Sequence, residues 1–159
     1  MTERPAALAR VTRAIGRAPI TALLGPRQCG KTTLARAFAA DRRATFFDLE
    51  SEPDRRRLQN PELALGGLRG LVVLDEIQAA PELYPVLRIL ADRPSRQARF
   101  LVLGSASPDI VRRVSETLAD RVELVGLTAF DIRAVGPAAW QRLWTRGGFP
   151  RAFLARSER

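Results

Sequence analysis

The residues from Gly25 to Thr32 read GPRQCGKT and have the spacing G-x-x-x-x-G-K-S/T, which is typical of a loop that binds phosphate groups. The backbone N–H groups of such a loop, together with the amino end of the helix that follows, bind phosphate oxygens. Lys31 is the only lysine among the 26 lysine and arginine residues of the chain. The sequence therefore keeps a compact ammonium group where the motif requires one and uses arginine everywhere else.

The positions of this loop predict distinct contacts with a nucleotide and its metal ion. We expect Lys31 to reach the β- and γ-phosphates and the hydroxyl of Thr32 to bind Mg²⁺. Cys29 is the only cysteine and fills a variable position of the motif, so a redox switch at this thiol is an alternative interpretation. Thr33 is expected to be a helix residue close to the site. The residues predicted to bind the nucleotide are Gly25, Pro26, Arg27, Gln28, Cys29, Gly30, Lys31, Thr32 and Thr33.

A second motif consists of a continuous apolar run that ends in Leu74, Asp75 and Glu76, the pattern called Walker B. We expect Asp75 to hold Mg²⁺, directly or through water, and Glu76 to polarise the attacking water. An acidic pair after a buried strand is also a common helix cap. Its place downstream of the phosphate loop, behind a second predicted strand, makes the catalytic interpretation specific.

Two other positions are candidates for contacts with a terminal phosphate. Ser105 ends a predicted strand and can contact the γ-phosphate or the lytic water, whereas Ser107 is better placed to cap the next helix. The alternative is that both serines simply make the turn. Arg121 opens the last predicted strand and is a candidate arginine finger, although a surface role is the alternative for any one of so many arginines.

The apolar pattern alternates between strands and helices. Strands are predicted over residues 20–25, 44–50, 70–78, 98–107 and 121–127. Helices are predicted within residues 1–19 and over 31–41, 51–63, 81–94 and 107–120. Since continuously apolar strands separated by helices are buried on both faces, we predict an α/β domain with a parallel sheet covered on each side. Ligands bind at the carboxyl ends of the strands in such sheets.

Composition limits the chemistry and the partners. The chain of 159 residues contains no histidine, which excludes zinc chemistry and histidine general bases. A net charge of +9 and a pI of about 11.4 make nucleic acid a conceivable partner. However, the arginines are dispersed, and 6% aromatic content offers few stacking surfaces. No apolar run reaches the length of a membrane span, so we expect no membrane contact and a cytoplasmic location.

Three other nucleotide-dependent functions are alternatives to ATP hydrolysis. A common GTPase needs an N-K-x-D element to recognise guanine, and with Lys31 already in the loop no lysine remains to build it. A P-loop kinase shares the loop but does not need the pair Asp75 and Glu76. A switch or scaffold that binds ATP without turnover would keep Lys31 and Thr32 and act through its partners. The kinase and the switch remain open.

The sequence resembles the bacterial and archaeal AAA-type ATPases of the ASCE class of P-loop proteins. It is most similar to the family that joins an N-terminal ATPase domain to a C-terminal domain of unknown function, sometimes likened to restriction-endonuclease folds. The segments that carry the resemblance cover nearly the whole chain from Ile20 onward and read GPRQCGKTTLA, FFDLE, LVVLDEIQAAPELYPVLRILADRP, FLVLGSAS, LADRVEL and WTRGGFPRAFLA.

This resemblance implies a three-layer P-loop NTPase fold with strand order 5-1-4-3-2 and the hydrolysis of ATP with Mg²⁺. It implies Ser105 as the sensor of the γ-phosphate and suggests Arg121 as the finger. Because Arg121 is expected to project from the far side of the last strand, it would more easily serve a neighbouring copy, which would require self-association. Arg151 falls where a lid begins and matches a second sensor loosely. Asp120 stands where the family usually has glycine before the finger.

We therefore expect one AAA-type ATPase core over residues 1–159, with an N-terminal helix in 1–19 and the start of a lid or linker in 136–159. The lid and the C-terminal domain are expected to be absent. Hydrolysis of ATP is expected to drive a conformational change in an appended domain or partner and to be weak in the isolated core.

Overall fold

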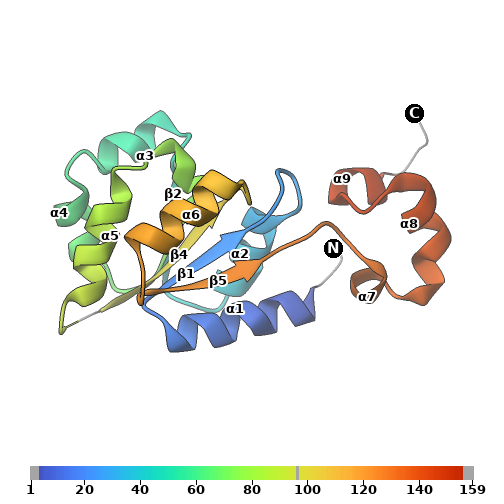
Figure 1. Ribbon diagram of the computed structural model, residues 1–159, viewed down its shortest axis with the longest axis horizontal. Helices are drawn as coiled ribbons and strands as arrows, with labels where there is room; N and C mark the ends of the chain where they lie inside the picture. Colours follow the sequence, from blue (N-terminus) through green and yellow to red (C-terminus); the bar gives the residue numbers. More distant parts are fainter. Residues whose placement is uncertain (1–3, 96, 156–159) are drawn as a thin grey trace.

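The computed structural model describes residues 4–95 and 97–155 and contains a central sheet with helices on both faces (Figure 1). The five strands are β1 (Ile20–Leu24), β2 (Ala44–Asp48), β3 (Gly70–Asp75), β4 (Ala98–Gly104) and β5 (Val122–Gly126). They are all parallel and lie in the order β2-β3-β4-β1-β5. This is the predicted order 5-1-4-3-2 read from the opposite edge, so the α/β fold class and the strand order are confirmed.

The strands follow from their apolar content. All five residues of β1 are buried, including Thr21, and four of the six residues of β3 are buried as a continuous run. Strands with both faces buried are characteristic of parallel sheets covered by helices. The edge strands β2 and β5 are less buried than the central ones.

Helices α1 (Pro5–Arg17) and α2 (Lys31–Ala39) cover one face of the sheet. Alternate strand residues point to this face, as expected from the two-residue period of a strand. The apolar residues buried here include Val11, Ala14, Leu23, Leu34, Phe38, Val73, Leu101 and Leu103. Burial of this set fixes α2, and with it the phosphate loop that precedes α2, against the sheet.

The opposite face packs against α5 (Leu83–Asp92) and α6 (Pro108–Thr117). The apolar residues buried there include Ile20, Ala22, Val72, Leu74, Leu83, Leu87, Leu90, Val102, Val114 and Leu118. The two apolar clusters on either side of one sheet make the three layers that were predicted.

The helix predicted over residues 51–63 is wrong in one respect, because the structure contains two short helices there. These are α3 (Glu52–Arg57) and α4 (Pro61–Gly66). The side chain of Asn60 accepts a hydrogen bond from the backbone N–H of Leu63 and caps α4. Pro61 lacks an N–H group and suits the first position of a new helix rather than the interior of a longer one.

All five strands end earlier than predicted, and two of these differences concern the site. β3 ends at Asp75 instead of residue 78, because Glu76 turns the chain with φ of 55° and ψ of 51° into the 3-10 turn η1 (Ile77–Ala79). β4 ends at Gly104, so Ser105 follows the strand. Both changes place the candidate catalytic residues in turns at the carboxyl edge of the sheet.

The chain then continues into a small helical segment beyond the carboxyl edge of the sheet (Figure 1). It contains α7 (Ile132–Val135), η2 (Pro137–Ala139), α8 (Trp140–Arg146) and α9 (Pro150–Phe153). The N–H of Phe130 donates to the carbonyl of Gly148 at 2.7 Å, and the rings of Phe130 and Phe153 meet edge to face at 5.5 Å. Among the described helices, none is long and apolar enough to cross a membrane.

Candidate functional site

Two glycines shape the loop between β1 and α2. A Cβ atom at Gly25 would lie 2.2 Å from the carbonyl oxygen of Leu127, too close for any side chain. Gly30 has φ of 97°, in the left-handed region that favours glycine, and immediately precedes α2. The first N–H groups of α2 have no acceptor within the helix, so they suit an anion held in the loop.

Lys31 begins α2 and is only 4% exposed. Its Nζ donates to the carbonyl oxygens of Gly25 and Pro26, each at 3.1 Å. The ammonium group therefore lies against the first two carbonyls of the loop that it follows in sequence. A phosphate oxygen would replace neutral acceptors with a charged one and form the stronger, charge-assisted hydrogen bond.

The loop and the end of β3 are joined by one hydrogen bond. The hydroxyl of Thr32 donates to Oδ2 of Asp75 at 2.7 Å. Hydroxyl and carboxylate oxygens are the ligands that Mg²⁺ prefers, so this pair fits the metal predicted from the sequence. The described residues contain no cluster of three or more His, Cys, Asp or Glu side chains able to hold a metal ion. Phosphate and water oxygens would therefore have to complete the coordination.

Asp75 also fixes the residue that follows it. Its Oδ1 accepts a hydrogen bond of 3.0 Å from the backbone N–H of Glu76, which has a left-handed backbone. Burial raises the pKa of the Asp75 carboxyl above its usual value, while the hydrogen bond from Thr32 acts in the opposite direction. Ser105 follows Gly104, whose carbonyl accepts from the N–H of Gly25 at 3.2 Å. The phosphate loop, Asp75, Glu76 and Ser105 thus share one edge of the sheet.

A cavity of about 530 Å³ lies beside the loop and was missed by sequence reasoning. Its walls come from α1, α2 and the C-terminal segment, and Cys29, Gly30 and Thr33 form part of its lining. The guanidinium of Arg4 lies 4.5 Å from the ring centroid of Phe130 and donates to the carbonyl of Thr128 at 2.9 Å. Nε of Arg4 is buried without a hydrogen-bond partner among the described residues.

The sequence also matches a known family of nucleotide-binding domains. A family of AAA domains, AAA_14, matches residues 17–135. The chain belongs to this AAA domain family. Its fold and family are those of nucleotide-binding P-loop NTPases, and the resemblance stated from the motifs is confirmed for the ATPase core.

Two curated relatives of this AAA domain are longer. The uncharacterized proteins Rv2008c of Mycobacterium tuberculosis and Mb2031c of Mycobacterium bovis are each 54% identical over 157 residues. The match covers 99% of this chain and 36% of each relative, so the chain spans about a third of their length.

Solved structures share the fold at low sequence identity. The Walker-type ATPase PABY2304 of Pyrococcus abyssi has a TM-score of 0.61 and 16% identity, over 91% of this chain and 58% of that one. A DNA replication initiation factor has a TM-score of 0.51 and 12% identity, over 88% and 49% of the two chains. At such low sequence identities, these two structures show similarity of fold alone.

The remaining loop residues of this AAA domain differ in exposure. Pro26, Arg27 and Gln28 are exposed, and Arg27 lies 3.7 Å from a carboxylate oxygen of Glu50. Thr33 is exposed on the first turn of α2. The side chains of these four predicted nucleotide-binding residues are therefore exposed to solvent.

Cys29 is fully buried, and its Sγ lies 3.7 Å from the carbonyl of Leu127. Burial raises the pKa of this thiol, although the charges of Lys31 and Arg4 oppose the shift. Reactive thiols have lowered pKa values and solvent access, so this environment does not favour the redox interpretation.

The structure does not bring Arg121 to the loop of its own chain. Arg121 precedes β5 and lies at the amino edge of the sheet, opposite the phosphate loop. Its guanidinium makes two hydrogen bonds to Asp92, of 2.6 and 2.9 Å. Arg151 is exposed and follows Pro150, whose ring would lie 3.8 Å from a Cβ atom at Gly30. Arg151 is thus the nearer of the two to the loop of its own chain.

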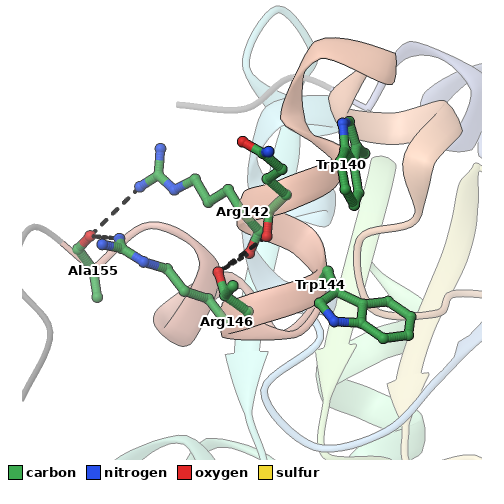
Figure 2. Close-up of a pocket in the computed structure, with 7 residues that line it drawn as sticks. Trp140, Arg142, Trp144, Arg146 and Ala155 are labelled. Carbon is green, nitrogen blue, oxygen red and sulfur yellow. Dashed lines mark hydrogen bonds between the residues drawn. The ribbon is translucent and has the colours of Figure 1, made fainter.

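A larger cavity, of about 730 Å³, lies on the C-terminal segment and is separate from the loop. Figure 2 shows Trp140 and Trp144 on one side of α8, while Arg142 and Arg146 extend toward Ala155. Both tryptophans are exposed, by 57% and 85%. The cavity contains neither a carboxylate nor a loop that binds phosphate, so we place no reaction there. Nucleic acid as a partner stays a prediction.

Proposed function

We propose that this AAA domain hydrolyses ATP with Mg²⁺ and that hydrolysis drives a conformational change in an appended domain or partner. The observation that carries the proposal is the 2.7 Å hydrogen bond between Thr32 and Asp75. It joins a lysine-containing phosphate loop to a strand end that also bears Glu76. A phosphate-binding loop without catalysis would not need a carboxylate next to the one that faces the metal position.

Each residue has a separate role in the proposed reaction. Lys31 would bind oxygens of the β- and γ-phosphates and offset negative charge. Glu76 would orient the attacking water and accept its proton, while the hydroxyl of Ser105 would contact the γ-phosphate or that water. When bound at Thr32 and Asp75, Mg²⁺ would supply charge neutralisation at the phosphate oxygens.

The cavity beside the loop supports ATP as the nucleotide. It is lined mainly by apolar side chains and adjoins Gly30, so a base attached to phosphates in the loop could enter it. The planar guanidinium of Arg4 offers a stacking surface and donors for a purine. The absence of any lysine besides Lys31 removes the common guanine-reading element.

The C-terminal segment is a suitable element to respond to the nucleotide. Pro150 lies against Gly30, and Phe130 is hydrogen-bonded to Gly148 in the same segment. A Cβ atom at Gly148 would lie 2.2 Å from the carbonyl of Phe130, so the two stretches pack without room for a side chain. A nucleotide that displaced Pro150 would therefore shift this segment as a unit.

A nucleotide-dependent switch without turnover is the second candidate. Arg121 lies at the opposite edge of the sheet and is paired with Asp92, so a single chain would lack this arginine at its γ-phosphate. An arginine finger contributes about 10³–10⁵ in rate in P-loop enzymes. Self-association that supplies Arg121 to a neighbouring copy would convert the binder into a catalyst.

The test measures melting temperature and phosphate release for the same set of variants. ATP with Mg²⁺ should raise the melting temperature of the wild type, and Lys31→Ala should abolish the increase. Arg36→Ala is the matched control, because Arg36 is an exposed cation on the same helix. Glu76→Gln should retain the melting shift and lose hydrolysis by about 10²-fold or more.

The outcomes separate the two candidates. A melting shift with no phosphate release at any protein concentration would favour the switch over the ATPase. An unchanged melting shift in Lys31→Ala would show that the loop is not the nucleotide site, which would overturn both proposals.

A further inference from the structure

Gln78 lies in the turn that follows the Walker B strand, two residues after Glu76. Its Nε2 donates a hydrogen bond to Oε2 of Glu76. Its Oε1 is buried and has no hydrogen-bond partner among the described residues. We propose that Gln78 is the positioning residue for the Glu76 carboxylate during hydrolysis, an inference that rests on the ATPase function proposed above.

The contacts around Glu76 form a connected series. Thr32 donates to Asp75, Asp75 accepts from the backbone N–H of Glu76, and the side chain of Glu76 accepts from Gln78. The backbone of Glu76 is held in the left-handed region, so the direction in which its side chain leaves the chain is fixed as well. The side-chain torsions of Glu76 are then fixed by Gln78, because Gln78 binds the Glu76 carboxylate itself.

An amide suits this task better than other side chains of similar size. A carboxylate that acts as a base accepts protons and offers no donor, so its positioning partner must donate. The neutral amide of Gln78 donates without adding a charge. It occupies one oxygen of Glu76 and leaves the other for a proton from water. A lysine or arginine there would form an ion pair and weaken the basicity of Glu76.

The other end of Gln78 faces the end of β4. A Cβ atom at Gly104 would lie 3.3 Å from Oε1 of Gln78 and 3.1 Å from Ile77. Ser105, the candidate phosphate sensor, is the next residue. The amide therefore spans the space between Glu76 and the turn that bears Ser105, and glycine at position 104 leaves room for it.

Two features of this turn lower stability, and function would explain both. The buried Oε1 of Gln78 is unfavourable, because it has lost its hydrogen bonds to water and forms none within the described residues. A left-handed backbone is unfavourable for a glutamate. An apolar residue in place of Gln78 would remove the first of these without loss of packing beside Ile77. A merely structural glutamine would be expected to have both ends satisfied.

The test replaces the amide with a side chain of similar length. Gln78→Met removes the donor, and Gln59→Met is the matched control at an exposed glutamine. In Gln78→Met, kcat should fall about 10- to 100-fold, a part of the contribution of a general base. KM and the ATP-induced melting shift should stay at wild-type values, and the melting temperature should not fall.

A double-mutant comparison separates positioning from structure. In a Glu76→Gln background, Gln78→Met should cause no further loss of kcat, because there is no base left to position. Equal losses in both backgrounds, or a lowered melting temperature, would overturn the inference. The inference would also be overturned if the wild type hydrolysed ATP and Gln78→Met were fully active. In that case the proposed ATPase function would stand. A wild type that binds ATP but releases no phosphate would instead overturn the ATPase function and the inference with it.

Discussion

The hydroxyl of Thr32 donates a hydrogen bond of 2.7 Å to Oδ2 of Asp75, which joins the first turn of α2 to the end of β3. These residues are 43 positions apart in the chain. They meet because β3 lies next to β4, and β4 lies next to the strand that leads into the loop. The order of the strands thus assembles a pair of oxygen ligands that neither motif contains alone.

This half-buried carboxyl should lower the stability of the metal-free protein at neutral pH. Burial raises the pKa of Asp75 above its usual 3.8, so the folded state binds the proton more tightly than the unfolded state. The free energy of unfolding therefore decreases as pH rises from 3.8 through the pKa of the folded state. Asp75→Asn removes the charge and can keep both hydrogen bonds, through its oxygen to Glu76 and its amide to Thr32.

We expect metal-free Asp75→Asn to melt above the wild type at pH 7, by roughly 2–4 °C for a gain of about 1 kcal/mol. The difference should disappear at pH values where Asp75 is protonated in both states. Thermal denaturation without Mg²⁺ at several pH values measures this, and Asp41→Asn provides an exposed control. A variant that melts below the wild type at pH 7 would contradict the assignment of burial as the dominant cause.

A second prediction concerns the thiol of Cys29. Burial raises the pKa of this thiol, and its Sγ contacts the carbonyl of Leu127 at 3.7 Å. Alkylation by iodoacetamide should be at least about tenfold slower in the native protein than in urea, because the thiolate is both scarce and inaccessible. Cys29 is the only cysteine, so mass spectrometry reports one site. Rapid alkylation of the native protein at neutral pH would instead revive the interpretation of Cys29 as a redox switch.

The sheet could be predicted well from the sequence because each strand is marked by an apolar run of neighbouring residues. Five apolar runs separated by helices dictate parallel strands with two covered faces, and the phosphate loop identifies which edge binds the ligand. The break between α3 and α4 was also readable in principle, since Asn60 and Pro61 are start signals for a second helix.

The missed parts depend on long-range packing and on backbone geometry. Arg4 and Thr128 are 124 residues apart, and only the folded chain brings Arg4 over Phe130 beside the loop. The contact between Gln78 and Glu76 is short in sequence. However, it forms in a turn where Glu76 has a left-handed backbone, which residue type alone does not indicate.

A third prediction follows from the backbone conformation of Asp120. Its φ is 62°, in the left-handed region, where an aspartate is tolerated and a glycine is unstrained. Asp120→Gly should therefore stabilise the protein by roughly 0.5–1 kcal/mol. Asp41→Gly is the control, because Asp41 is exposed and is not among the described residues with positive φ. Urea unfolding that ranked Asp120→Gly below the wild type would show that the aspartate side chain has a role of its own.

The fourth prediction tests whether Arg121 serves a neighbouring copy. Within one chain, Arg121 lies at the amino edge of the sheet, and Lys31 lies at the carboxyl edge. One guanidinium therefore cannot reach the phosphates bound by its own loop. In a ring or filament of copies packed head to tail, the amino edge of one sheet can face the loop of the next. Arg121 would then exchange Asp92 for a phosphate, a charged acceptor that can likewise take two hydrogen bonds from the guanidinium.

Mixing two inactive variants distinguishes this arrangement from an ordinary ion pair. Lys31→Ala keeps the finger and loses the loop, whereas Arg121→Ala keeps the loop and loses the finger. Each variant alone should hydrolyse ATP about 10³-fold or more slowly than the wild type at concentrations where the protein associates. An equal mixture should recover about a quarter of wild-type activity, because random assembly joins an intact loop to an intact finger at about one interface in four. Dilution below the association range should abolish the recovery. If Arg121→Ala alone hydrolyses ATP like the wild type, Arg121 does no more than pair with Asp92, and the arginine that completes the site must be sought elsewhere, first at Arg151 beside the loop.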